Sequence, residues 1–232
     1  MRRIGILFIA SLLVAACGSS IGSKAAAPKP STTSITEPTQ DQTIVSSGLL
    51  RASDLPGYSQ RPLGKSSPDF DQISKGVPSC EAFVSAQLHG SDRQRSPRFT
   101  HGNVHVYDSV DVYRSAADIA AHVDLYRDPT TLQCLRDALR KHLDQFDAAL
   151  TLDSLDVSPI AVNEVGDSQF ALRFTATVDQ SGQKSTILLD LVGVAVGRFA
   201  LSFISKGTTA ELAELETTLL PKLVDRMHQA GA

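Results

Sequence analysis

Three cysteines carry the most specific chemistry of this 232-residue chain, and each stands in a different context. Cys17 follows Val14-Ala15-Ala16, after a charged start at Met1-Arg2-Arg3 and an apolar run from Ile4 to Val14. A charged n-region, an apolar h-region and a small-residue cleavage site are the three parts of a secretory signal. The sequence therefore predicts export, with residues 1–16 removed as the signal peptide.

The small pair before Cys17 resembles the lipobox of bacterial lipoproteins, and Gly18-Ser19-Ser20 after it agrees with this. The resemblance implies that the thiol takes a diacylglyceryl group and that Cys17 becomes the first residue. Acyl chains such as palmitate would then hold the protein on the extracytoplasmic face of the cell membrane. A transmembrane helix needs about 20 apolar residues, which this run does not supply. A soluble secreted protein and a cytoplasmic protein with an apolar start remain alternatives.

Cys80 and Cys134 are the other two cysteines, an even pair in a chain that the signal sends to an oxidising compartment. Such a pair is typical of a disulfide. Two free buried thiols or a metal pair are the alternatives. The metal is disfavoured because structural zinc sites add further cysteine or histidine ligands, and no histidine is adjacent to either residue.

The histidines predict no metal site or cofactor. His101 and His105 share a parity on one expected strand, but four strand positions separate two side chains by about 13 Å. The remaining histidines are scattered: His89, His122, His142 and His228. The sequence contains no HExxH motif, no paired CxxC and no aspartate-rich calcium loop.

No residue pattern predicts catalysis. The chain has no G-x-S-x-G elbow. Two carboxylate pairs, Asp69 with Asp71 and Asp153 with Asp156, would serve acid–base chemistry only if a cleft held them about 5–10 Å apart. Solvated loop charges are the simpler interpretation. The glycines of Gly193-Val-Ala-Val-Gly197 lie within an expected strand, where they ease packing or a bend rather than bind phosphate.

A candidate ligand face combines aromatic and imidazole side chains of one parity along residues 98–113. It consists of Phe99, His101, His105, Tyr107 and Tyr113. If the polar, proline-rich loop 59–78 folded over it, a mixed apolar and polar groove would result, of the kind that binds a ligand. The alternative is the half-exposed face of an edge strand.

Charge and composition exclude nucleic acid as a partner. The formal net charge is −3, and it becomes −5 once Arg2 and Arg3 leave with the signal. No basic stripe occurs, so neither nucleic acid nor an anionic membrane surface attracts the chain by charge. Residues 17–43 are mostly Ser, Thr, Pro, Gly and Ala, which predicts a disordered tether. Residues 44–232 then form a single domain.

Within the domain the periodicity predicts helices and strands in separate blocks. Strands are expected over residues 98–113, 150–162, 169–179, 185–196 and 199–205. Apolar side chains alternate along the first and third of these, whereas residues 188–196 are nearly all apolar, which predicts a central strand. Ser79 should cap a short helix through Gln87, Ser115 a helix to Arg127, and Asp128-Pro129 a helix to Phe146. Thr208 and Glu211 form a capping box for a terminal helix that contains Pro221. Asp108 interrupts the apolar parity of its strand, which predicts a bulge or bend.

The fold class expected from this order is α+β: an antiparallel sheet of about five strands packed on one face by helices, including a long C-terminal helix. The tether, Asp54-Leu55-Pro56-Gly57, the helix-borne Cys80 and Cys134 and the final strands and helix resemble actinobacterial lipoproteins of the LpqN / Mog1-PsbP-like class. They are also similar to PknH-type extracellular sensor domains. The resemblance covers residues 44 to 230 and implies a binding or accessory role at the cell envelope, with no catalytic residues to carry over.

The sequence therefore predicts a lipid-anchored, non-enzymatic, sensor-like domain that binds another envelope protein or a small amphiphile or glycan. Two other functions stay open. A lipid carrier would need a deep cavity, and a cell-wall hydrolase or transferase would need two convergent carboxylates in a cleft.

Overall fold

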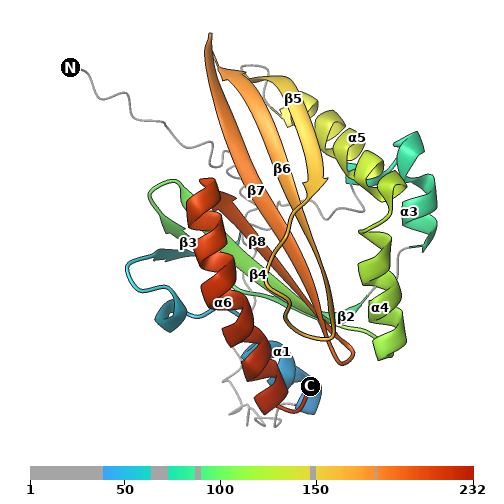
Figure 1. Ribbon diagram of the computed structural model, residues 1–232, viewed down its shortest axis with the longest axis vertical. Coiled ribbons are helices and arrows are strands. Elements are labelled where there is room, and N and C mark those ends of the chain that lie inside the picture. The colour runs from blue at the N-terminus through green and yellow to red at the C-terminus, as the bar shows by residue number, and fades with distance from the viewer. Residues whose placement is uncertain (1–38, 64–72, 87–89, 147–149, 181) are drawn as a thin grey trace, which may run out of the picture. The chain divides into compact units, whose positions relative to one another are not determined.

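An eight-stranded antiparallel sheet forms the middle of the domain (Figure 1). The computed structural model describes residues 39–63, 73–86, 90–146, 150–180 and 182–232. The predicted signal, Cys17 and most of the tether lie outside this range. The strand order is β1-β3-β4-β8-β7-β6-β5, with β2 also pairing with β4. The strands are β1 Ser59–Arg61, β2 Ser91–Arg95, β3 Arg98–His101, β4 Val104–Val112, β5 Leu150–Pro159, β6 Ser168–Gln180, β7 Gln183–Val196 and β8 Phe199–Gly207.

The C-terminal meander β5 to β8 confirms the strands predicted there, within a few residues at each end. Each strand pairs with the next in sequence. Gly182 and Gly197 lie in the turns between them with φ of 84° and 58°, a conformation that glycine adopts without steric cost. Local alternation and glycine turns are therefore enough to specify this half of the sheet.

Helices cover both faces of the sheet, so the prediction of one covered face was wrong (Figure 1). They are α1 Gln40–Ser47, η1 Ala52–Asp54, η2 Pro78–Cys80, α3 Glu81–Ala86, α4 Ala116–Leu125, α5 Pro129–Phe146 and α6 Thr209–Gln229. We call the face that packs on α1 and α6 the α6 face, and the face that packs on α3, α4 and α5 the α4 face. The physical reason is that β7 and β8 bury side chains of both parities, which a single helical layer would leave half exposed.

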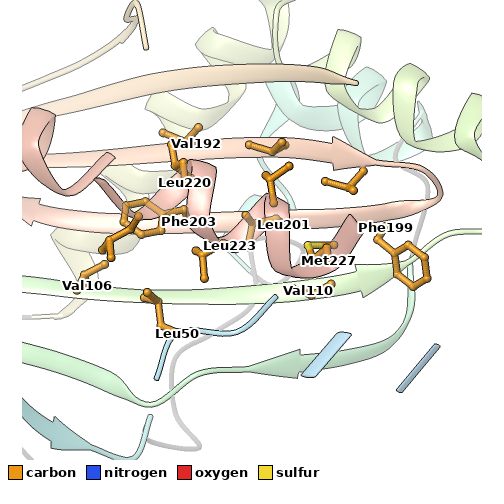
Figure 2. Close-up of a cluster of buried hydrophobic side chains, with 14 of the residues drawn as sticks. Leu50, Val106, Val110, Val192, Phe199, Leu201, Phe203, Leu220, Leu223 and Met227 are labelled. Carbon is orange, nitrogen blue, oxygen red and sulfur yellow. The ribbon is translucent and has the colours of Figure 1, made fainter. Parts of the chain in front are cut away.

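The α6 face holds the larger apolar cluster (Figure 2). Leu220, Leu223 and Met227 of α6 lie on the central strands. Their partners from the sheet include Val106, Val110, Val192, Leu201 and Phe203, all of them at most 1% exposed. On the α4 face, Ala195 of β7 and Ala200 of β8 are small, so α4 approaches the sheet closely.

The N-terminal half of the sheet differs from the prediction. The expected strand 98–113 is a hairpin, β3 and β4, which turns at Gly102 with φ of 57°. Two further short strands, β1 and β2, were not predicted. Together with the division of 98–113 into β3 and β4, they raise the count from about five to eight. They are polar, and no alternation marks them.

Asp108 does not cause the bulge that was expected. It keeps regular register with Phe203 and points into the α6 face with no exposed surface. The register irregularity lies instead in β2, between Ser91 and Gln94, where Asp92 has φ of 50°. The Asp108 carboxylate can be buried among apolar side chains because the backbone N–H of Leu50 donates to both of its oxygens, at 3.1 and 3.2 Å.

Two helices, α4 and α6, start at their predicted caps. The Ser115 hydroxyl accepts from the Asp118 N–H, and Thr208 and Glu211 form a reciprocal capping box. The first helix begins at Gln40 behind a Thr39–Gln42 capping box, four residues before the expected boundary at 44. Its sequence, QDQTIVSS, is mostly polar and carries only two buried residues, so it resembles the tether in composition.

The predicted disulfide between Cys80 and Cys134 is present, with 4.7 Å between the two Cα atoms. It joins η2 to the second turn of α5. Next to it, the Ser79 hydroxyl donates to Asp137 of α5 at 2.7 Å, so Ser79 contacts α5 rather than capping a helix. The bridge fixes the short 78–86 segment on the α4-face helices.

Removing the bridge should lower the free energy of unfolding. With a sequence separation of 54 between the cysteines, the chain-entropy model gives a loss of about 4 kcal/mol for Cys80→Ala with Cys134→Ala. Urea unfolding of the double variant and of the oxidised wild type measures this difference. Alkylation of Cys80 or Cys134 in the native protein before reduction, mapped by peptide mass spectrometry, would contradict the bridge.

Candidate functional site

The five residues of the predicted ligand face do not share one face. The two-residue turn of the β3–β4 hairpin pairs His101 with Val104 and Phe99 with Val106. Phe99 and His101 therefore lie on the α6 face, where Phe99 is fully buried. His105, Tyr107 and Tyr113 have the other parity and lie on the α4 face. The prediction assumed one continuous strand, in which all odd-numbered residues share a face. The two-residue turn at positions 102 and 103 places the odd-numbered residues of β3 and of β4 on opposite faces.

His105 and Tyr107 remain together on a half-exposed part of the α4 face. Tyr107 pairs with Ile204 of β8, which pairs with Leu191 of β7, and all three side chains are half-buried. The Arg98 guanidinium lies 5.7 Å from the centre of the Tyr107 ring. Burial raises the pKa of Tyr107, so the phenol is neutral at physiological pH.

A pocket of about 350 Å³ lies toward the β5 edge of the sheet, where β5 ends. We call it the Tyr126 pocket. It is lined by Tyr126, Arg127, Pro159, Ile160, Ala161, Val162, Glu164, Gln169, Phe170, Ala171 and Leu172. The lining is mostly apolar with a few polar groups, the usual composition of a small-molecule site.

The pocket exists because β6 extends past the end of β5: Pro159 pairs with Leu172, and residues 168–171 of β6 have no ladder partner in β5. Pro159 is the last residue of β5 and has no backbone N–H to continue a ladder. The Ile160 N–H still donates to Ala171 O, and then the chain leaves the sheet. The edge of β6 at Gln169 is consequently not covered by β5. Arg127 reaches it from the end of α4 and donates to Gln169 O at 2.6 Å.

The loop between β5 and β6 is held in place by the Gln169 side chain. Its carbonyl oxygen accepts from the Val165 N–H at 3.0 Å, and its amide donates to Asn163 O at 3.1 Å. Asp167 accepts from the Gly197 N–H at 2.7 Å and ties the same loop to the β7–β8 turn. The loop is therefore held by hydrogen bonds from β6 and from the β7–β8 turn.

An aromatic stack forms one side of the pocket. The Phe170 and Tyr126 rings lie parallel, with centroids 4.2 Å apart and planes inclined by 2°. Tyr126 also meets Phe83 edge-on at 5.6 Å and His122 at 5.2 Å. The Phe170 ring lies on Gly193 of β7, since a Cβ at Gly193 would come within 2.1 Å of the ring. A glycine between apolar neighbours on the paired strand was the sequence signal for this stack.

The described histidines form no cluster that could hold a metal ion, and the predicted carboxylate pair Asp153 and Asp156 is bound to cations. Within the described residues, no three His, Cys, Asp or Glu side chains could hold a metal ion. Asp153 pairs with Lys184 at 2.6 Å, and Asp156 pairs with Arg136 at 3.6 Å. The other predicted pair, Asp69 and Asp71, lies outside the described range.

Two groups of buried acids lie on the α6 face, and sequence analysis singled out only Asp108 among them. Burial raises the pKa of Asp108 to about 6, against the lowering effect of Ser96 and the Leu50 N–H. Burial also acts to raise the pKa of Asp54, but Lys222, the Arg51 N–H and Arg226 together hold it below its usual value. The second group contains Glu216 of α6 and Asp190 of β7, with 6% and no exposed surface respectively.

Comparisons with known proteins find similarity in structure alone. No family model matches the sequence, and no curated protein matches it. The extracellular domain of PknH from Mycobacterium tuberculosis is similar, at 12% identity over 80% of this chain and 95% of that one, with a TM-score of 0.48. A Pseudomonas aeruginosa protein of unknown function, PA94, matches 71% of this chain and 96% of its own at 14% identity, with a TM-score of 0.24. The first match agrees with the resemblance inferred from the sequence, and it transfers no function.

Alanine at Gly193 should disturb the aromatic stack. A Cβ would have to displace the Phe170 ring, and overpacking of this kind costs about 1–3 kcal/mol. Gly193→Ala should cost clearly less in a Phe170→Leu background, where the ring is absent. Urea unfolding of the two single variants and the double variant measures this coupling. Strictly additive changes in the free energy of unfolding would show that the packing of the Phe170 ring does not depend on glycine at position 193.

Proposed function

We propose that this chain is a lipid-anchored, extracytoplasmic domain without catalytic activity of its own, and that it binds a small ligand in the Tyr126 pocket. The observation that carries the proposal is the pocket itself, an aromatic and aliphatic recess at the open edge of β6 with Arg127 beside it. Ligand sites of this kind are commonly concave, mostly apolar and supplied with a few fixed polar groups.

The disulfide supports the extracytoplasmic location, because such bonds persist in oxidising compartments and are rare in the cytosol. Anchoring rests on Cys17, which lies outside the described residues, and on its resemblance to a lipobox. A diacylglyceryl cysteine with its acyl chains binds a bilayer durably, since each buried CH₂ contributes about 0.8 kcal/mol. Among the described helices, none has the length and apolar character of a membrane span.

The lining of the pocket narrows the ligand class. Phe170, Leu172 and Ile160 offer apolar contact, which suits an aliphatic or aromatic group. Arg127 and Glu164 supply one positive and one negative charge beside it. A small amphiphile with an apolar body and a polar or charged end fits this composition better than a glycan, which would need more hydrogen-bonding side chains.

A carrier of lipid is the related alternative. The pocket of about 350 Å³ is at the lower end of the range for small-molecule sites, so it suits one end of an acyl chain or a compact molecule. A cell-wall hydrolase or transferase receives less support, because the carboxylates Asp153 and Asp156 each pair with a cation.

Binding of an envelope protein is the second candidate function. It is favoured by the half-buried row Tyr107, Ile204 and Leu191 on the α4 face, and by Val84 of α3, which is 45% exposed. Crosslinking in intact cells distinguishes this function from ligand binding.

Filling the pocket should abolish ligand binding. Ala161 is exposed and lines the pocket, so Ala161→Trp places an indole at its mouth with little effect on the core. Ala210, exposed on α6, gives the matched control Ala210→Trp. We expect the affinity for anilinonaphthalene sulfonate, an anionic aromatic amphiphile, to fall at least tenfold in Ala161→Trp and severalfold in Arg127→Ala.

Fluorescence titration of the full chain, with the detergent kept below its critical micelle concentration, gives these affinities. Native mass spectrometry of the chain secreted from an actinobacterial host reports a bound natural ligand. Equal loss in Ala161→Trp and Ala210→Trp, or a clean mass with no probe binding, would contradict the proposed site.

Serine at position 17 should release the protein from membranes. Without the thiol, no diacylglyceryl group can attach, and none of the described helices could span a membrane. Fractionation of cells followed by a carbonate wash measures the distribution of Cys17→Ser and of the wild type. A variant that stays with the membrane fraction after the wash would show that the lipobox assignment is wrong.

A further inference from the structure

Glu216 interrupts the apolar stripe of α6. The buried residues on either side of it in this helix are Leu212, Leu215, Leu219 and Leu220. Glu216 is only 6% exposed, so its carboxyl lies within the layer between α6 and the sheet. A carboxyl group in this position loses its hydration and must be compensated by the groups beneath it.

A polar row of the sheet lies on the same face. Arg173 of β6 pairs in register with Asp190 of β7, which pairs with Ser205 of β8. The Arg173 guanidinium donates to both Asp190 oxygens, through Nε at 2.7 Å and Nη2 at 2.5 Å. Asp190 and Ser205 have no exposed surface. The row is therefore a buried bidentate ion pair with a hydroxyl beside it.

The charges of this group do not balance if both acids are ionised. One guanidinium faces two carboxylates, and the guanidinium is already paired with Asp190. In the described part of the chain, Oε1 of Glu216 and Oγ of Ser205 are buried without a hydrogen-bond partner. A proton on Glu216 removes the excess negative charge and allows the two carboxyl groups to share a hydrogen bond.

We infer that one proton held between Glu216 and Asp190 fastens α6 to the sheet, and that its loss in alkaline solution loosens the first half of the helix. The charged groups that act on Glu216 are Asp190 from β7 and Arg173 from β6. Ser205 of β8, which pairs in register with Asp190, is neutral. The acids on the same half of α6, Glu211 and Glu214, are exposed.

Burial, followed by the hydrogen bond and the charge of Asp190, raises the pKa of Glu216 from 4.5 to about 8, while Arg173 opposes the shift. A raised folded-state pKa contributes stability that is complete below 4.5 and is lost as the pH rises through 8. Asp108 contributes the same way only up to about 6. The lowered pKa values of His105 and His142 change the free energy of unfolding only below pH 6.5. Of these four groups, only Glu216 has a folded-state pKa that lies between pH 6.5 and about 8.

The test compares the full chain, purified in detergent, with Glu216→Gln and with the control Glu214→Gln. Uptake of one proton on folding changes the folding equilibrium constant up to tenfold per pH unit. Urea unfolding should show this constant falling by roughly 16-fold between pH 6.5 and 8 in the wild type and in Glu214→Gln. It should stay nearly constant in Glu216→Gln, whose amide keeps a donor but cannot ionise.

Two measurements locate the effect. Carboxyl ¹³C NMR of the wild type should show Glu216 titrating near pH 8, and this remains decisive if the glutamine variant does not fold. Amide exchange at pH 8.5 should be faster in the first half of α6 in the wild type than in Glu216→Gln, with β5 and β6 unchanged. Titration of Glu216 near pH 4.5, equal pH slopes in all three proteins, or identical exchange in α6 would overturn the inference.

Discussion

The two-sided burial of β7 and β8 is the constraint on which the rest of the domain depends. Val192 and Val194 of β7 are buried on the α6 face, and Ala195 is buried on the α4 face. A strand with both faces apolar must lie in the middle of a sheet with cover on each side. The chain supplies that cover from segments far apart in sequence: α1 and α6 on one face, and α3, α4 and α5 on the other (Figure 1).

The two faces solve this packing problem differently. On the α6 face, large side chains from α6 and the sheet fill the space between them (Figure 2). On the α4 face, glycine and alanine at positions 193, 195 and 200 leave room for the Phe170 ring and for α4 itself. The aromatic stack follows from this difference. The Tyr126 pocket lies where the stack meets the end of β5, so its position depends on the small residues of the central strands as much as on its own lining.

The sequence predicted the parts of the structure that are determined locally. The meander β5 to β8, the capped helices and the cysteine pair are marked by alternation, turn glycines and caps within a few residues of one another. The second helical layer was missed because the prediction rested on the order of helices and strands, although the continuous apolar run of β7 indicated burial on both faces. The predicted ligand face was wrong because the chain turns at Gly102, and a two-residue turn changes which residues share a face. The pocket could not be predicted, because it is formed by a strand ending, a distant arginine and a glycine on another strand.

Charged side chains complete the attachment of the segments that the apolar core alone does not position. Arg198 at the β7–β8 turn binds Asp41 of α1, and Arg226 of α6 donates to Leu49 O and to Asp54. With the Leu50 N–H bound by Asp108, the residues that follow the predicted tether are connected to three elements of the domain. Because these bonds use buried or half-buried carboxylates, they hold a fixed geometry that a solvated surface pair would not. The N-terminal segment 39–54 is thus attached to β4 and to the last turns of α6, the same helix whose first half contains Glu216.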